Sequence, residues 1–221
     1  MLADRLYERA ATIAFRLIAV KSRTEFVRLG SRYGGWWVPV SVLSPGAVAY
    51  CAGAGEDVTF DVSLLEHGLR VTTFDPTPRS VQYVTSLGMT DERFRFLPVG
   101  WWNEDTEIDL YAPRDPAHVS YSALDLQATG QSITAPVRRV STLARELGDT
   151  KVDLIKMDIE GAEMTVLPDL LSNGPLPRVL CVEFDKVRPL RDVTSLIRRL
   201  KRAGLMPARS EERNVTFVRD L

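Results

Sequence analysis

Glycines and aspartates stand at the ends of four apolar, strand-like segments, and these residue types at this spacing could bind a nucleoside. The four segment ends carry Gly53-Ala-Gly55, Asp75, Gly100 and Asp158. Glycines let a backbone approach a ligand closely, and a carboxylate about 20 residues after a glycine turn can accept hydrogen bonds from both ribose hydroxyls. Ligands of open α/β sheets bind at the carboxyl edge of the strands. The pattern therefore predicts a nucleoside-containing cofactor at that edge, with ordinary packing as the alternative.

The charges beside the glycine turn indicate which nucleoside-containing cofactor would bind there. A dinucleotide-binding turn has a third glycine, but Val58 stands at that position, and Glu56 and Asp57 place negative charge where a pyrophosphate would bind. A cationic ligand suits that charge, and S-adenosylmethionine carries an amino group and a sulfonium. The sequence favours this cofactor over NAD. An NAD-type oxidoreductase and a nucleoside-binding module without catalysis are the alternatives.

The elements that must hold these residues alternate between strand and helix. Strands are expected at 47–51, 69–74, 94–99, 152–157 and 178–183, and helices at 58–68, 79–88, 140–147, 162–172 and 193–203. This alternation predicts an α/β fold with a parallel sheet and right-handed crossovers. Residues 205–210 and 214–219 are expected to form a closing β-hairpin. Residues 106–111 fit a strand or a loop, and 112–135 lack periodicity, which is typical of a binding loop or lid.

The N-terminal segment carries a different pattern. Residues 2–29 place apolar side chains on one stripe at helical spacing, which predicts an amphipathic helix that covers the main domain. A substrate lid, a dimer contact and a membrane-surface helix are alternatives. The adjacent Trp36 and Trp37 cannot both face one core. We expect an N-terminal helical appendage over residues 1–40 and one domain over residues 41–221.

Composition limits the partners. The chain has 221 residues, a hydrophobic share of 45%, a net charge of −1 and two cysteines. The charge gives no reason to expect a nucleic-acid partner. Cysteines without metal or disulfide spacing fit the cytoplasm, and no apolar run reaches the length of a membrane span or forms a signal peptide. A homodimer is compatible with these observations.

The segment Lys156-Met-Asp-Ile-Glu-Gly-Ala-Glu163 resembles the signature of the FkbM-type methyltransferases, and the similarity extends over roughly residues 34–185. The resemblance implies a Rossmann-like class I methyltransferase fold, with a seven-stranded, mostly parallel sheet and helices on both faces. It also implies S-adenosylmethionine-dependent O-methylation of a hydroxyl on a small natural product, sugar or glycan. The expected cofactor-binding residues are Cys51, Gly53, Gly55, Asp57, Asp75, Pro76, Gly100 and Asp158. Many relatives have an acid where Cys51 stands and differently placed glycines in the turn, which leaves open how the methionyl amino group is held; Asp57 or Asp158 could substitute.

Methyl transfer to an alcohol needs a group that removes a proton. The candidate catalytic residues are Asp158, Glu160 and His118, and Glu183 and Asp185 are further candidates for the base. Glu160 could equally be an acid that stabilises a helix N-terminus, and His118 a solvated loop residue. Asp158, Glu160 and Asp185 have the oxygen ligands of a magnesium site, but we expect no metal.

Overall fold

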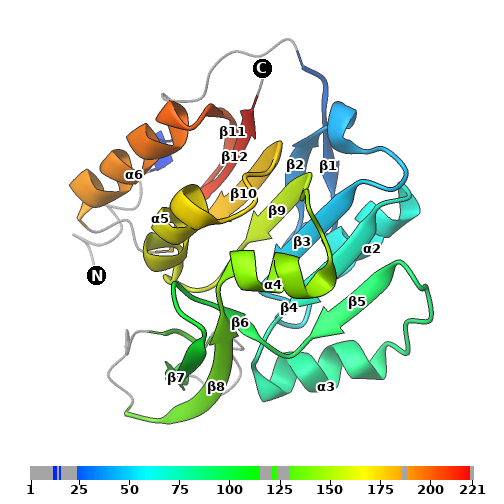
Figure 1. Cartoon of the computed structure of the whole chain (residues 1–221), viewed down its shortest axis with the longest axis vertical. Helices are drawn as coiled ribbons and strands as arrows, with labels where there is room; N and C mark the ends of the chain where they lie inside the picture. Colours follow the sequence, from blue (N-terminus) through cyan, green and yellow to red (C-terminus); the bar gives the residue numbers. More distant parts are fainter. Residues whose placement is uncertain are drawn as a thin grey trace.

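The computed structural model describes residues 12, 13, 15, 24–114, 121–123, 130–185 and 189–219. Its centre is a seven-stranded sheet in the order β11-β12-β10-β9-β3-β4-β5 (Figure 1). The strands are β3 (Val48–Ala52), β4 (Arg70–Phe74), β5 (Phe94–Leu97), β9 (Leu154–Met157), β10 (Val179–Glu183), β11 (Leu205–Glu211) and β12 (Asn214–Arg219). β12 runs antiparallel to both of its neighbours, β10 and β11, and every other neighbouring pair in this sheet is parallel. The predicted parallel sheet and closing hairpin are confirmed.

Helices cover both faces of this sheet. They are α2 (Thr59–Glu66), α3 (Pro78–Ser86), α4 (Val140–Leu147), α5 (Glu163–Asn173) and α6 (Leu190–Arg202). One core cluster joins α4, α5 and α6 to one face of the sheet, and Figure 1 shows α4 and α5 in front of the strands. A second cluster joins α2 to the opposite face, and α3 packs beside it. The central strands are buried on both sides, which explains their nearly continuous apolar sequences.

A second, three-stranded sheet lies at the carboxyl edge of the strands. It has the order β6-β8-β7, from β6 (Gly100–Trp101), β7 (Thr106–Tyr111) and β8 (Ser132–Arg138). The sequence leaves 112–135 unassigned, but β8 begins inside that stretch. Pro136 hides the strand pattern, because proline is unfavourable within sheets. It is tolerated because β6 pairs only with Val137 and Arg138, so Pro136 has a neighbouring strand on one side alone.

The helix predicted over residues 2–29 is wrong at its end. Residues 26–29 form β1 (Phe26–Leu29), which pairs with β2 (Trp36–Pro39) in an antiparallel hairpin. Phe26 and Val27 favour a strand, and Gly34 and Gly35 allow the turn that pairs it. Before the hairpin, residues 12, 13 and 15 are helical. Phe15 is buried and stacks on Phe184 with ring centroids 5.3 Å apart.

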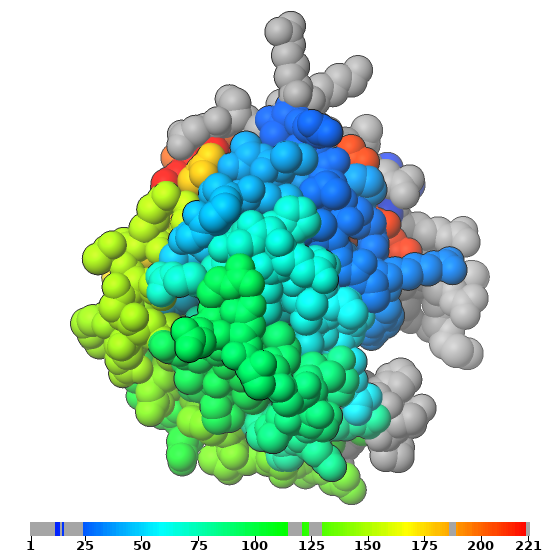
Figure 2. Space-filling model, turned by 90° about the vertical axis from the view of Figure 1, so that its right-hand side faces the viewer, coloured from blue at the N-terminus to red at the C-terminus, as the bar shows by residue number. Residues whose placement is uncertain are grey.

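The hairpin packs on the main sheet. Trp36 is buried in the core cluster under α2, whereas Trp37 faces the other way, with Arg209 4.1 Å above its ring. The two tryptophans therefore point to opposite sides, as expected. Figure 2 shows the blue segment that contains the hairpin lying against the cyan segment that contains α2. The domain boundary predicted after residue 40 falls inside the short 3-10 helix Val40–Val42, and it stays a prediction. Among the described residues, no helix is both long and apolar enough to cross a bilayer.

The turn of the hairpin is anchored to the glycine loop after β3. The Ser31 hydroxyl donates to Asp57 at 2.5 Å, and the Ser31 amide donates to the Thr59 hydroxyl at 2.7 Å. Asp57 also accepts from the Thr59 amide at 2.9 Å. The hairpin and the start of α2 thus share one hydrogen-bond network around the Asp57 carboxylate.

Replacing Ser31 with alanine should destabilise the fold, because a partly buried carboxylate loses a hydrogen-bond donor. We expect the free energy of unfolding to fall by about 1 to 3 kcal/mol, measured by urea denaturation. The control is Ser86→Ala, since the exposed Ser86 hydroxyl contacts only its own helix, at the Tyr83 carbonyl. Equal stability of the two variants would contradict the anchoring role.

Candidate active site

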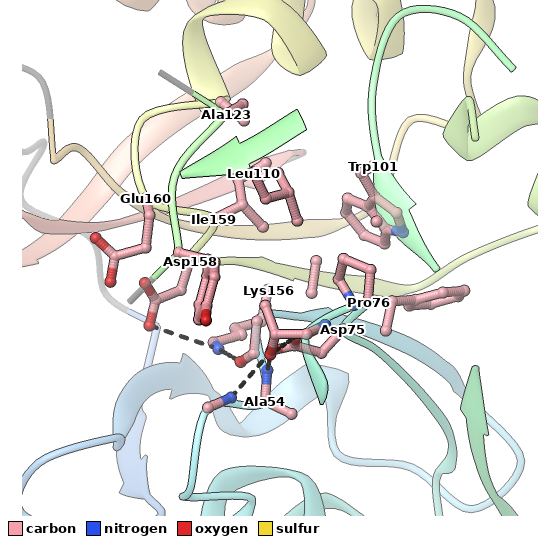
Figure 3. A pocket seen from close by; sticks show the side chains of 18 of the residues that line it. Ala54, Asp75, Pro76, Trp101, Leu110, Ala123, Lys156, Asp158, Ile159 and Glu160 are labelled. Carbon is pink, nitrogen blue, oxygen red and sulfur yellow. Dashed lines mark hydrogen bonds and ion pairs between the residues drawn. The ribbon is translucent and has the colours of Figure 1, made fainter. Parts of the chain in front are cut away.

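A cavity opens where the carboxyl ends of β3, β4 and β9 meet the three-stranded sheet (Figure 3). Most of the residues that the sequence singles out line it: Gly53, Gly55, Asp57, Asp75, Pro76, Gly100, Asp158 and Glu160. Cys51 does not, because its side chain is fully buried in the core beneath α2. We therefore do not retain Cys51 as a ligand contact. His118 lies outside the described residues.

The glycine loop is pressed against the end of β9. Gly53 has a φ of +87°, and a Cβ atom at this position would overlap the carbonyl oxygen of Asp158. The Asp158 amide donates to the Ala52 carbonyl at 3.2 Å, which continues the pairing of β3 with β9. Only glycine can occupy position 53, because any side chain would separate the two strand ends.

Asp75 holds the glycine loop in shape. Its Oδ2 accepts from the amides of Ala54 at 2.9 Å and Gly55 at 3.1 Å. Its Oδ1 accepts from the amide and the hydroxyl of Thr77, at 2.9 and 2.7 Å. The sequence predicts that this carboxylate binds ribose hydroxyls. What the structure shows is that Asp75 orders the loop, a role that sequence spacing alone does not reveal.

The two acids that follow Gly55 both have protein partners. Glu56 forms a two-point ion pair with Arg79, at 2.7 and 3.0 Å. Partial burial raises the pKa of Asp57, but hydrogen bonds from Ser31 and Thr59 outweigh it, so this pKa lies below its ordinary value. Asp57 therefore stays ionised at the cavity wall. The same carboxylate accepts hydrogen bonds from Ser31 in the hairpin turn and from Thr59 at the start of α2.

Lys156 is the cation of this site, and sequence reasoning missed it. Its ammonium donates to the Gly53 carbonyl at 2.5 Å and lies 3.6 Å from Oδ2 of Asp158. Burial lowers the pKa of Lys156, but Asp158 and Asp61 outweigh that effect and raise it. The available signal was a lysine in the otherwise apolar β9, whose neighbours are buried on both faces.

The cavity is negatively charged overall. Among its described lining residues, Lys156 is the only lysine or arginine, whereas the acids are Glu56, Asp57, Asp61, Asp75, Asp158 and Glu160. The lining also includes apolar residues, among them Ile108, Leu110, Val137 and Ile159. A ligand that fits this lining combines positive charge with an apolar part.

The turn between β9 and α5 is conformationally unusual. Glu160 has a φ of +54°, a left-handed conformation that costs residues other than glycine roughly 1–2 kcal/mol. The Ser122 hydroxyl donates to the Glu160 carbonyl at 2.7 Å. The buried Glu163, in the first turn of α5, accepts from the amides of Ile159 and Gly161 at 3.1 and 3.2 Å. These contacts hold Glu160 at the cavity wall in spite of the strain.

A pair of acids lies beside the cavity, at the end of β10. Glu183 and Asp185 both contact Arg213, at 3.1 and 3.2 Å. Burial, together with the nearby Asp158 and Glu160, raises the pKa of Glu183 to about 8 and that of Asp185 to about 7. Neither residue is part of the cavity lining. Among the described residues, no group of three or more acids, histidines or cysteines is arranged to hold a metal.

The sheet order, the single antiparallel strand and the ligand-sized cavity at the carboxyl edge define the Rossmann-like class I methyltransferase architecture. The chain belongs to the methyltransferase FkbM domain family, whose model matches residues 48–204. The cofactor of this family is S-adenosylmethionine. The predicted family and cofactor are therefore confirmed.

Curated relatives share part of this chain. It is 30% identical over 131 residues to the probable methyltransferase-like protein 24 of Rattus norvegicus and 29% identical to that of Homo sapiens. Each match covers 59% of this chain but only 30% of the relative. Among solved structures, a Methanococcus jannaschii fibrillarin pre-rRNA processing protein aligns with a TM-score of 0.47 and 10% identity, covering 89% of this chain and 81% of that one.

The acid pair at the end of β10 should make stability depend on pH. A carboxyl whose pKa is raised on folding keeps its proton in the folded state while the unfolded state loses it. Stability should therefore fall as the pH rises from about 5 to 8, the interval between the ordinary carboxyl pKa values and those of Asp185 and Glu183. Asp185→Asn should reduce this loss by roughly 1 to 2 kcal/mol.

Urea denaturation at pH 5, 6, 7 and 8 measures this slope. The exposed substitution Glu66→Gln is the control, and it should leave the slope of the wild type unchanged. An Asp185→Asn variant with the wild-type slope would show that the pair does not retain a proton on folding.

Proposed function

We propose that this chain is an S-adenosylmethionine-dependent methyltransferase that methylates a hydroxyl group of a small natural product, sugar or glycan. The observation that carries the proposal is the convergence of the 53–57 loop, Asp75 and Asp158 on one cavity. These three places lie more than 100 residues apart along the chain at their extremes, and the pairing of β3 with β4 and β9 brings them together. Family membership supports the same activity.

The chemistry of the cavity fits this cofactor. The ammonium and sulfonium groups of S-adenosylmethionine suit a lining with six acids and one lysine. The adenosyl group of the cofactor suits the apolar residues of the same lining. Asp75 and the glycine loop would hold the ribose, and Asp158 the amino group. A pyrophosphate would instead face Glu56, Asp57 and Asp75, which disfavours NAD or FAD.

Within this proposal, bound S-adenosylmethionine supplies an electrophilic methyl group. Asp158 and Glu160 lie on the same side of the cavity (Figure 3), and with Asp158 holding the amino group, Glu160 would accept the proton that the acceptor hydroxyl loses. Ile108, Leu110 and Ile159 exclude water from the reacting groups. A catalytic role for His118 stays a prediction, as do the cytoplasmic location and a homodimer.

Asp75→Ala tests the placement of the cofactor. The Ala54 and Gly55 amides would lose their acceptor, and the ribose hydroxyls would lose theirs. S-adenosylhomocysteine should therefore bind at least about tenfold more weakly, or about 1.4 kcal/mol, by isothermal titration calorimetry. Asp91→Ala, at an exposed ion pair with Arg93, is the control. Wild-type affinity in a folded Asp75→Ala protein would refute this placement, and NAD binding by the wild type would favour the oxidoreductase.

Glu160→Gly separates catalysis from folding. Glycine accepts the left-handed φ of position 160 without strain, so thermal stability should be kept or slightly raised. Cofactor binding should also be retained, whereas turnover of an acceptor that the wild type methylates should fall at least about a hundredfold. Product is measured as methylated acceptor by mass spectrometry. Full turnover would remove Glu160 from the chemistry, and a wild type that binds cofactor but methylates no hydroxylated acceptor would favour the non-catalytic module.

A further inference from the structure

The indole nitrogen of Trp101 is a buried polar atom without a hydrogen-bond partner in the described part of the chain. Trp101 is 3% exposed and lines the cavity, and its Nε1 is shielded from solvent. The only other described side-chain nitrogen or oxygen in this condition is Oδ2 of Asp185. Buried N–H donors are nearly always paired, because an unpaired one loses its bond to water without replacement. Trp101 therefore calls for a partner that the folded chain alone does not supply.

Packing does not require an indole nitrogen at this position. The Trp101 ring packs on Phe74 with centroids 5.2 Å apart, in a cluster where a phenylalanine would leave no polar atom to satisfy. The backbone beside it is fixed, because a Cβ atom on Gly100 would come within 3.1 Å of Val137 and 3.2 Å of Pro76. The backbone that carries the indole is thus held at one place on the cavity wall.

The position of Trp101 indicates which part of a ligand it meets. Figure 3 shows Trp101 and Pro76 on one side of the cavity, across from Asp158 and Glu160. Pro76 follows Asp75, just after the end of β4, and Gly100 and Trp101 form β6, so this side lies between the end of β4 and β6. Phe74, which packs on Trp101, and Val137, which lies beside Gly100, add apolar surface on this side. A flat, apolar group with a hydrogen-bond acceptor in its ring suits this end of the cavity.

We propose that the Trp101 indole N–H donates a hydrogen bond to a ring nitrogen of the cofactor's purine base. The inference rests on the proposed function, because it takes the ribose to lie at Asp75. From there the base extends past Pro76 and Gly100 to the indole. Because Nε1 is shielded from solvent, the indole has to rotate about its side-chain bonds for Nε1 to meet the base. Trp101 then distinguishes a purine with a nitrogen at that ring position from a carbon analogue of the same shape.

Calorimetry with S-adenosylhomocysteine and its 1-deaza, 3-deaza and 7-deaza analogues tests this contact. The wild type should bind one analogue about tenfold more weakly than S-adenosylhomocysteine, because a ring C–H replaces the acceptor. Trp101→Phe should bind S-adenosylhomocysteine about tenfold more weakly and should no longer discriminate that analogue. Trp102→Phe is the matched control, since Trp102 is the next residue and is absent from the cavity lining, and it should behave as the wild type.

A second measurement uses the native protein. With ¹⁵N-labelled indoles, one N–H resonance should shift downfield on addition of S-adenosylhomocysteine and stay in place with the analogue that lacks the acceptor. Equal affinity of the wild type for all three analogues, or discrimination retained in Trp101→Phe, would overturn the inference while leaving the cofactor in place. Failure of the wild type to bind S-adenosylhomocysteine would instead reject the proposed function, and this inference with it.

Discussion

The contact between the end of β3 and the end of β9 is the constraint on which the site depends. Gly53 lies against the carbonyl of Asp158, and the Lys156 ammonium joins the Gly53 carbonyl to the Asp158 carboxylate. This contact sets how close the glycine loop comes to the acidic end of β9. Asp75 then shapes the same loop from β4. β3, β4 and β9 therefore place the residues at their carboxyl ends around one cavity, and these contacts fix the residues relative to one another.

The charges around Lys156 are a second constraint on the site. A lysine inside the sheet is unfavourable unless acids surround it, and Asp61 and Asp158 provide that environment here. Burial raises the pKa of Asp61, and this effect outweighs Lys156 and a hydrogen bond from Thr73, which both lower it. Asp61 is therefore protonated more readily than an ordinary aspartate. The result is a cavity whose lining has more acids than cations. Such a site attracts cations over anions before any specific hydrogen bond forms.

Much of this architecture could be predicted from sequence, because it follows from local periodicity. The alternation of apolar strands with amphipathic helices predicted the parallel sheet, and the spacing of Gly55 and Asp75 predicted that these two strand ends adjoin. What could not be predicted depends on tertiary contacts. Residues 26–29 become a strand because β2 pairs with them, and Pro136 sits in β8 because its other side lacks a partner. Cys51 occupies a strand end in the sequence, but the pleat turns its side chain into the core.

Ser31, Asp57 and Thr59 form one network that joins the hairpin turn to the loop at the cavity. Its members come from two separate segments, yet none can change without altering the partners available to the other two. During divergence, a loss at one of these positions would be repaired most easily by a second change at another. Aligned relatives should therefore vary at positions 31, 57 and 59 in concert, which would mark the hairpin as an inherited part of the cofactor loop.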